Sequence, residues 1–471
     1  MIQPLYENVE ILDAGSEGNA VARVGDLVIF VPFVVPGDVV DIRPTRRKKS
    51  FLEGRAVRFH RYSEKRAEPF CSHFGTCGGC RWQNMKYEEQ LFFKQKQVAD
   101  AFERIGKIDR AGILPILPSP STTYYRNKLE FTFSNRRWLE QQDKTLHPGD
   151  REMNALGFHL PLLFDRVLDI GTCWLQPDPS NAIRHETKKY ALGNGLSFYD
   201  VRTWQGFLRN LIVRTTGTGG VMVILVTRND EKEEISRMLG HLSGRFPEIT
   251  SLFHVINPKR NDVISDLPHL LFKGDPWIEE KMKDYREKKE ILFRIGPASF
   301  FQTNTEQALA LYRVASEFAG FEGHETVYDL YSGTGAIADF IASSVQKVIG
   351  IESVAAAVED ARENAGRNGI DNVFFFPGEL EKTLNADFIR QNGAPHIVIT
   401  DPPRAGMHEK VTRAILSAAP RKVVYISCNP ATQARDVSIL KEKYDLVKCR
   451  PVDMFPHTQH VENVALLVRR D

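Results

Sequence analysis

The chain has 471 residues, which at about 150 residues per domain predicts roughly three domains. Hydrophobic residues make up 42% of the chain and charged residues 26%, which excludes a wholly disordered, collagenous or disulfide-scaffold protein. The net charge of +2 by itself neither favours nor excludes a nucleic acid partner.

The sequence predicts neither a membrane segment nor an export signal. The apolar run from Leu27 to Val35 contains Pro32 and is far shorter than the roughly 20 residues that span a bilayer. The N-terminus lacks a basic segment followed by an apolar stretch. We therefore expect a cytoplasmic protein without a membrane partner, in a compartment where disulfides are rare.

Residues 1–62 are predicted to form short strands separated by turn signals such as Gly15, Gly18 and Pro36-Gly37. The expected strands cover residues 9–12, 20–24, 27–31, 38–42 and 54–59. This density of strands favours a small OB-like barrel, a fold that often reads nucleic acids, and a docking domain is the alternative.

Charge is unevenly distributed along this segment. Residues 1–40 hold one Arg and six acidic residues, whereas residues 41–70 hold ten Lys or Arg and four acidic residues. The local excess of positive charge lies next to Phe51, Phe59 and Tyr62, a pattern that fits a polyanion-binding surface. A solvated basic face is the alternative reading.

Three of the six cysteines, Cys71, Cys77 and Cys80, fall within ten residues. In a cytosolic protein such a group indicates metal binding or catalysis. Zinc and iron–sulfur sites both use four such ligands, so the spacing leaves the two open.

After this loop, apolar residues recur at helical spacing between Tyr87 and Ile105, and Gly106 ends the predicted helix. The apolar positions are Leu91, Phe92, Val98, Phe102 and Ile105. The segment 120–290 then reads as antiparallel strands with some helices, with strands expected at 128–133, 155–159, 211–216, 221–227 and 251–257.

From about residue 290 strands and helices alternate, which predicts a mostly parallel sheet covered by helices. Strands are expected at 327–331, 347–351, 373–376, 397–400, 423–427 and 464–468, with a helix at 354–368.

The run from Asp329 to Ala338 follows the first of these strands and contains Gly333 and Gly335. Glycines at this turn let the backbone approach a nucleotide cofactor closely. Glu352 ends the next strand, where its carboxylate could accept hydrogen bonds from a ribose. The motif alone does not separate NAD from S-adenosylmethionine, and a turn without a ligand is the third possibility.

Asp401-Pro402-Pro403-Arg404 ends the fourth strand, at the edge of the sheet that faces the ligand crevice. The two prolines stiffen the loop, which would hold Asp401 rigidly in the crevice. Such a motif is similar to that of methyltransferases that act on nucleobases, and a surface turn is the alternative.

Cys428 follows the fifth strand at the same edge, and its thiol is a candidate nucleophile whose pKa Arg404 could lower. Glu462 stands beside the last strand and is a candidate general base, with His457 and His460 as rivals. A core cysteine and a surface carboxylate are the alternatives.

A thiol paired with a base suits methylation of uracil C5. This carbon becomes nucleophilic only after a thiolate adds to C6, and a base must afterwards remove the C5 proton. Methylation of a ring nitrogen needs no such covalent step.

Taken together, the motifs resemble those of the RNA uracil-C5 methyltransferases, and most closely the 23S rRNA (uracil-5-)-methyltransferases that carry a TRAM domain and a [4Fe-4S] cluster. The resemblance covers essentially the whole chain. It rests on the cysteine loop and on the segments 300–304, 329–335, 401–404, 427–430 and 460–463.

The resemblance implies that Cys428 is the nucleophile and Glu462 the base. It implies that S-adenosylmethionine is bound, or its pocket shaped, by Gln302, Tyr331, Glu352 and Asp401. It also favours a [4Fe-4S] cluster, held by Cys71, Cys77, Cys80 and Cys173. His73 is the rival of Cys173 as the fourth ligand.

We therefore expect an α/β protein with a C-terminal doubly wound, Rossmann-like methyltransferase domain at 291–471. A TRAM-like OB β-barrel is expected at 1–62 and a central β-rich domain with the iron–sulfur loop at 63–290. The helix at 87–106 is expected to pack on the catalytic domain.

The expected activity is methylation of uridine C5 in RNA, with 23S rRNA as the first substrate and tRNA as the alternative, by a monomeric enzyme. A rival of another class is an NAD-dependent oxidoreductase. A catalytically silent iron–sulfur protein that binds RNA is a further rival.

Overall fold

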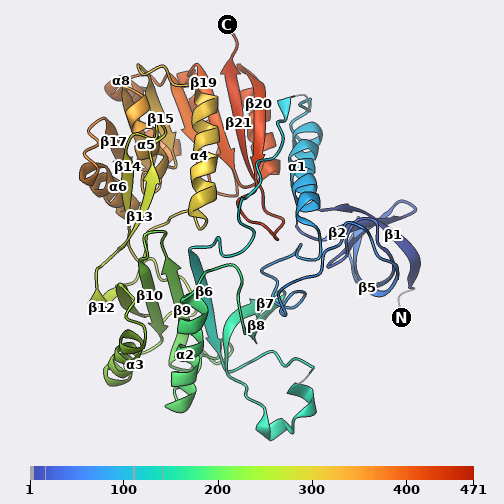
Figure 1. Cartoon of the computed structure of the whole chain (residues 1–471). Coiled ribbons are helices and arrows are strands. Elements are labelled where there is room, and N and C mark those ends of the chain that lie inside the picture. The colour runs from blue at the N-terminus through green and yellow to red at the C-terminus, as the bar shows by residue number, and fades with distance from the viewer. Residues whose placement is uncertain (1–4, 16, 110–111, 142) are drawn as a thin grey trace.

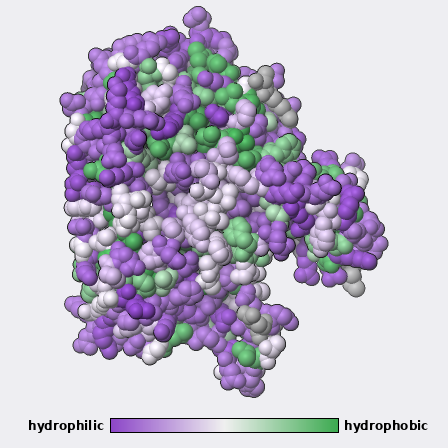
Figure 2. All heavy atoms as spheres, viewed as in Figure 1, coloured by the Kyte–Doolittle hydropathy of each residue, from purple (hydrophilic) through white to green (hydrophobic). Residues whose placement is uncertain are grey.

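The computed structural model describes residues 5–15, 17–109, 112–141 and 143–471. Along the chain it consists of a small barrel, a central sheet and a C-terminal sheet, with the barrel projecting to one side (Figure 1). None of the helices among the described residues is long and apolar enough to cross a membrane. On the face shown in Figure 2 most of the surface is hydrophilic.

The N-terminal barrel is closed in the order β1-β2-β3-β5-β4. Its strands are β1 Tyr6–Ala14, β2 Ala20–Val24, β3 Leu27–Val31, β4 Val39–Arg47 and β5 Phe51–Arg61. Apolar side chains that alternate along the strands, among them Ile11, Ile29 and Val40, fill the interior. The predicted five-stranded barrel is confirmed, although β4 and β5 extend further into the basic segment than expected.

Helix α1, Tyr87–Arg104, buries a different face from the one expected. Val98 and Phe102 are buried as predicted, but Phe92 and Ile105 are exposed. The helix instead buries Gln90, Phe93 and Lys94. The prediction of its inward face was partly wrong because it assumed that polar side chains point to solvent.

The central sheet has seven strands in the order β12-β11-β10-β9-β6-β7-β8. They are β6 Lys128–Ser134, β7 Ala155–Leu160, β8 Leu163–Asp169, β9 Leu208–Thr215, β10 Val221–Thr227, β11 Ser251–Ile256 and β12 Leu270–Gly274. The expected antiparallel pairing needs one correction, because β10 and β11 are parallel. The helices of this part, α2 Ser180–Gly193 and α3 Lys232–Arg245, pack on the sheet, and α3 joins the two parallel strands.

A hairpin of β13 Ile278–Lys283 and β14 Glu290–Ile295 follows. Its side chains Met282 and Phe293 share a core with the C-terminal sheet and its helices. The boundary expected at residue 290 falls at the first residue of β14, inside this hairpin.

The C-terminal sheet has the order β17-β16-β15-β18-β19-β21-β20. Its strands are β15 Thr326–Leu330, β16 Lys347–Glu352, β17 Val373–Pro377, β18 Ile397–Thr400, β19 Lys422–Ser427, β20 Tyr444–Val452 and β21 Glu462–Arg469. The first five are parallel, and β21 lies antiparallel between β19 and β20. The predicted doubly wound sheet is confirmed, and β20 is a strand that the sequence analysis missed.

Helices cover both faces of this sheet. Helices α4 Thr305–Ala319, α5 Ala336–Ile341 and α6 Ala355–Arg367 pack into the core on one face. Helices α9 Glu409–Ala418 and α10 Pro430–Leu440 cover the other face together with α1, while α7 Leu380–Thr383 and α8 Ala386–Asn392 complete this part. Chain order turns back between β15 and β18, and ligands of such sheets bind at this point.

Candidate active site

A cavity of about 1090 Å³ opens at the carboxyl ends of β15, β16, β18 and β19. It lies where the topology of the sheet predicts a ligand site. The structure brings to this one cavity every residue expected to act in catalysis or cofactor binding: Gln302, Tyr331, Glu352, Asp401, Cys428 and Glu462.

The glycine-rich turn after β15 forms one wall of the cavity. Gly333 and Gly335 have φ angles of 54° and 81°, in the left-handed region that favours glycine, and Gly335 caps the start of α5. The Glu352 carboxylate accepts hydrogen bonds from the backbone N–H groups of Gly333, at 3.0 Å, and Val354, at 2.9 Å. Glu352 therefore fixes the turn as well as facing the cavity.

Asp401 follows β18, and the loop behind it is tied to the cysteine segment. The carbonyl of Arg404 accepts hydrogen bonds from Asn429 Nδ2, at 3.1 Å, and Thr432 Oγ1, at 3.2 Å. Burial raises the pKa of Asp401 to about 7. The carboxyl group is thus held at the cavity in an environment that disfavours its charged form.

Cys428 lies between β19 and α10, whose first residues are set by a cap. The Asn429 side chain accepts a hydrogen bond from the N–H of Ala431, and Pro430 occupies the first helical position. Burial raises the pKa of Cys428 to about 11, and the carboxyls of Glu462 and Asp401 add to this effect. Arg404 lowers it, as expected, but is outweighed, so the thiol is protonated at neutral pH.

Glu462 begins β21 and is buried. Burial and, to a lesser extent, the Asp401 carboxyl raise its pKa to about 8, and Arg404 opposes both effects. A carboxyl group with such a pKa can accept and release a proton near neutral pH, as a general base must.

The structure separates the two histidines that rival Glu462. His460 lines the cavity, and burial lowers its pKa to about 4, which leaves it neutral. His457 is not among the residues that line the cavity, and its Nδ1 lies 3.2 Å from the side chain of Gln90. Of the two, only His460 is placed to contact a substrate.

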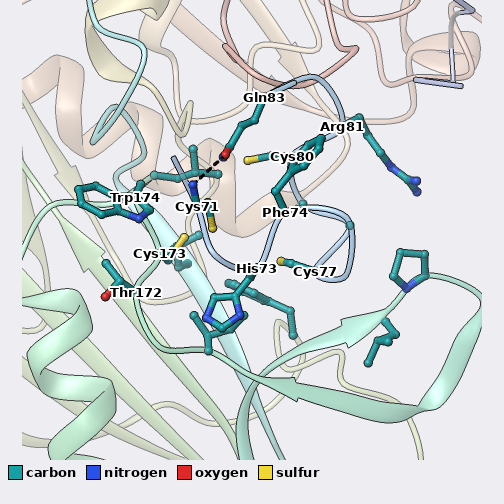
Figure 3. A pocket seen from close by; sticks show the side chains of 18 of the residues that line it. Cys71, His73, Phe74, Cys77, Cys80, Arg81, Gln83, Thr172, Cys173 and Trp174 are labelled. Carbon is teal, nitrogen blue, oxygen red and sulfur yellow. Dashed lines mark hydrogen bonds between the residues drawn. The ribbon is translucent and has the colours of Figure 1, made fainter. Parts of the chain in front are cut away.

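The four cysteines expected to bind metal line a second cavity, of about 550 Å³ (Figure 3). Cys71, Cys77 and Cys80 come from the loop before α1, and Cys173 from the loop before α2. His73 also lines this cavity, but its Nε2 accepts a hydrogen bond from the N–H of Gly171 at 2.8 Å. That hydrogen bond occupies Nε2, whereas Nδ1 of the same ring is buried without a hydrogen-bond partner.

The cysteine thiols do not form a closed metal site. Among the described residues, the group of His, Cys, Asp or Glu side chains whose ligand atoms all lie within 4.8 Å of one another is Glu322, His324 and Glu325. No three of the cysteine thiols meet this criterion, whereas Zn–S bonds of about 2.3 Å in a tetrahedral site would place all the sulfurs about 3.8 Å apart. Burial raises the pKa of Cys77 to about 11 and that of Cys80 to about 12.

The sequence analysis missed a buried polar network behind the active site. Lys94 Nζ lies 2.5 Å from Asp453 Oδ1, and both side chains are fully buried. Tyr87 donates a hydrogen bond to the same carboxylate at 2.8 Å. A helical lysine such as Lys94 can be predicted to be buried only when the acidic residue that pairs with it is known.

Similarity to known proteins agrees with this geometry. Residues 269–470 match the family model of tRNA (uracil-5-)-methyltransferases, and residues 8–55 match the TRAM domain of tRNA (uracil(54)-C(5))-methyltransferase. An "uncharacterized RNA methyltransferase" of Bacteroides thetaiotaomicron is 52% identical over 97% of this chain and 100% of its own length. One of Porphyromonas gingivalis is 50% identical over 98% of this chain and 99% of its own.

The same relationship holds for a solved structure, that of Pyrococcus abyssi tRNA (uracil-54, C5)-methyltransferase in complex with S-adenosyl-L-homocysteine. It superimposes with a TM-score of 0.73 at 27% identity and covers 98% of this chain and 99% of its own.

Fold, cavity and relatives thus define an RNA methyltransferase that uses S-adenosylmethionine. The chain belongs to the RNA uracil-C5 methyltransferase family, with a TRAM domain at its N-terminus. Family membership decides between the two cofactors that the glycine-rich turn had left open, and the expected S-adenosylmethionine is confirmed over the rival NAD.

Proposed function

We propose that the protein methylates C5 of a uridine in RNA through a covalent adduct between Cys428 and uracil C6. The observation that carries this proposal is the meeting of Cys428 and Glu462 in one cavity with the glycine-rich turn and Glu352. A nucleophile and a base beside a nucleotide cofactor site are what C5 methylation requires. The target base would be flipped out of its stack to reach them.

Each residue has a separate task in this mechanism. The Cys428 thiolate forms a bond to C6, and the electron pair of the C5–C6 double bond makes C5 nucleophilic. Bound S-adenosylmethionine would supply the methyl group to C5, and its S–CH3 bond would break to leave S-adenosylhomocysteine. Glu462 then takes the C5 proton, the C5–C6 double bond re-forms, and the Cys428 thiolate leaves.

The positive charge of the cofactor would favour ionisation of the Cys428 thiol. Burial, with a further contribution from the carboxyl groups of Glu462 and Asp401, raises the pKa of Cys428 and keeps the thiol protonated in the free protein. A sulfonium cation in the same cavity would oppose these carboxylates and favour the thiolate. Gln302, Tyr331, Glu352 and Asp401 are the residues proposed to hold the cofactor or shape its pocket.

Two variants separate the two catalytic roles. Cys428→Ala should form neither product nor adduct, because the bond to C6 cannot form. Glu462→Gln should add and methylate, then stall as an RNA–protein adduct that survives denaturing electrophoresis and carries the new methyl group. Turnover by the Cys428 variant without any adduct in the Glu462 variant would show that both roles are wrongly assigned.

The substrate that we propose first is 23S rRNA, because of the resemblance to TRAM-containing rRNA enzymes, and the enzyme is proposed to act as a monomer. Basic side chains on β4 and β5, including Arg46, Arg47 and Arg58, would contact the phosphate backbone. A tRNA is the second candidate, because the Pyrococcus abyssi protein whose structure superimposes with a TM-score of 0.73 is a tRNA (uracil-54, C5)-methyltransferase.

Mapping of 5-methyluridine in total RNA, with and without the gene, decides between these substrates. Loss of the modified base from 23S rRNA alone supports the first candidate, and loss from tRNA alone supports the second. Incubation of the purified protein with each RNA and labelled S-adenosylmethionine provides the matching test in vitro.

We further propose that Cys71, Cys77, Cys80 and Cys173 hold a [4Fe-4S] cluster. The donor set supports this assignment, because four cysteines from two distant loops share one cavity (Figure 3). Thiols that stand too far apart to surround one ion suit a cluster, which is wider. The cluster would tie the loop before α1 to the central sheet.

Metal analysis of anaerobically purified protein tests this assignment. About four irons and four labile sulfides per chain are expected. Cys173→Ser should lower the iron content, whereas Cys449→Ser, a matched change at a buried cysteine of β20, should not. Stoichiometric zinc without iron would contradict the proposal.

A further inference from the structure

The segment that joins β20 to β21 has its backbone carbonyls bonded one after another by side chains from distant parts of the chain. Gln307 Nε2 donates to the carbonyl of Asp453 at 2.7 Å, and Asn304 Nδ2 donates to that of Met454 at 2.9 Å. Both donors belong to the start of α4. Three further carbonyls are bonded in turn, two by side chains and one by backbone N–H groups.

The next donors come from other elements of the chain. Lys94 Nζ, from α1, donates to the carbonyl of Phe455 at 3.0 Å, and Tyr125 donates to that of Pro456 at 2.9 Å. The carbonyl of His457 accepts the backbone N–H groups of Arg81 and Trp82, which directly follow Cys80. Residues 453–457, hereafter the clamped segment, are therefore held by α4, by α1 and by the cysteine loop.

The clamped segment leads directly into the active site. Phe455 and His460 line the same cavity as Glu462 and Cys428. Thr458 Oγ1 donates to the carbonyl of Phe455 at 2.7 Å and accepts the N–H of His460 at 3.3 Å. A shift of the clamped segment would therefore be transmitted through the two hydrogen bonds of Thr458 Oγ1 to His460, two residues before Glu462.

The ion pair between Lys94 and Asp453, at the start of the clamped segment, contributes little to the stability of the fold by itself. Lys94 and Asp453 are both fully buried, and removal of two charges from water usually offsets their attraction. The pair does more than join two side chains, because Lys94 also bonds the carbonyl of Phe455 and Asp453 accepts the N–H of that residue at 3.2 Å. Its geometry fixes the backbone beside the cavity.

We propose that Lys94, with Asp453 and Tyr125, is a positioning residue for the general base: it holds the clamped segment so that Glu462 stands where the C5 proton must be taken. This inference rests on the proposed function. Lys94, Asp453 and Tyr125 are not proposed to act in the earlier addition and methylation steps, because Cys428 and the glycine-rich turn belong to other loops. Loss of the clamp should therefore slow one step of the reaction selectively.

The test compares two RNA substrates with the full-length protein. With 5-fluorouridine RNA the reaction stops at the methylated adduct, because fluorine cannot leave as a cation, so the rate of trapping reports only the steps before the base acts. With uridine RNA the turnover rate includes proton removal. The ratio of the two rates isolates the contribution of Glu462.

The main variant is the double change Lys94→Met with Asp453→Asn, which avoids an unpaired buried charge. Trapping should proceed at the wild-type rate, turnover should fall about tenfold to a hundredfold, and the Cys428 adduct should accumulate on uridine RNA. Tyr125→Phe removes a single hydrogen bond and should give the same pattern more weakly. It keeps the test valid if the double variant does not fold.

Lys96→Met is the matched control. Lys96 lies on the same helix and forms ion pairs with Asp13, at 2.6 Å, and Asp100, at 2.7 Å, but does not bond the clamped segment. At saturating RNA its ratio of turnover to trapping should equal that of the wild type.

Two results would overturn the positioning role. One is a parallel fall in trapping and turnover in the double variant and in Tyr125→Phe, as a purely structural defect would produce. The other is unchanged turnover in both. If the wild-type protein forms no adduct with 5-fluorouridine RNA, the proposed function fails, and this outcome differs from either of the others.

Discussion

At the scale of single residues, the active site is governed by carboxyl groups that are kept from solvent. Glu462 and Asp401 face the same cavity as the Cys428 thiol, and burial raises the pKa of all three side chains. Arg404 is the cation that opposes the shifts at Glu462 and Cys428. The cavity therefore becomes more negative as pH rises through the neutral range.

This arrangement predicts how the rate depends on pH. The proposed base must be ionised to take the C5 proton after methylation, so kcat should rise tenfold per pH unit below the pKa of Glu462, which is about 8, where proton removal limits turnover. Arg404→Gln removes the cation that lowers this pKa and should move the rise to higher pH. Rate measurements from pH 6 to 9.5 check both points, and a profile that is flat between pH 6.5 and 8 would contradict the role of Glu462.

At the scale of elements, the glycine-rich turn between β15 and α5 is constrained both by its backbone and by its packing. Gly335 adopts a φ of +81°, and a Cβ at this position would lie 2.6 Å from the ring of Phe375. Gly333 also has a positive φ, +54°, but a Cβ there would meet nothing within 4 Å. Both positions need glycine for the backbone, and only Gly335 needs it for packing as well.

The two glycines therefore form a matched pair of variants. Gly335→Ala should lower the free energy of unfolding by about 2–4 kcal/mol, from backbone strain and overlap with Phe375. Gly333→Ala should cost about 1–2 kcal/mol, from strain alone. Urea denaturation of both variants measures the difference, and equal losses would mean that Phe375 moves aside without cost.

At the scale of the whole molecule, the C-terminal part holds an excess of buried carboxyl groups. Asp329 and Asp339 are buried without hydrogen-bond partners for their carboxylates, and burial raises the pKa of each well above its ordinary value. Together with Asp401 and Glu462 they retain protons in the folded state that the unfolded chain releases above pH ~4. Two of the four, Asp401 and Glu462, line the cavity of about 1090 Å³.

Linkage turns this excess into a dependence of stability on pH. Because the folded state binds more protons than the unfolded state, stability should fall as pH rises through the pKa values of Asp401, about 7, and Glu462, about 8. The melting temperature of the cofactor-free protein should decrease between pH 7 and 8, above the ordinary histidine pKa of about 6.5, as Asp401 and Glu462 lose their protons. Differential scanning fluorimetry measures this trend.

The ligands supply the control for this prediction. S-adenosylmethionine carries a sulfonium charge that S-adenosylhomocysteine lacks, so its stabilising effect should increase more with pH. The double variant Asp401→Asn with Glu462→Gln should show a flatter curve without ligand. A melting temperature that rises with pH in the wild-type protein would refute the assignment of buried, protonated carboxyls.

The sequence by itself determined the elements and the chemistry of single motifs. The repeat of apolar residues that marks a strand or a helix is a property of residues close together in the sequence. For this reason β10 and β18 were predicted with their observed first and last residues. The glycine-rich turn and the cysteine after β19 followed from their positions at strand ends, because parallel strands place those ends at one edge of the sheet.

Only the tertiary structure decided which polar side chains are buried and what they meet. The periodicity of α1 predicted that Phe92 is buried, but Gln90 and Lys94 are buried in its place. Their burial is possible because His457 and Asp453 pair with them, and these partners lie more than 350 residues further along the chain. The same applies to the pKa of Cys428, which the sequence tied to Arg404 and which burial raises instead. Desolvation and pairing depend on the whole fold, and local sequence carries no record of either.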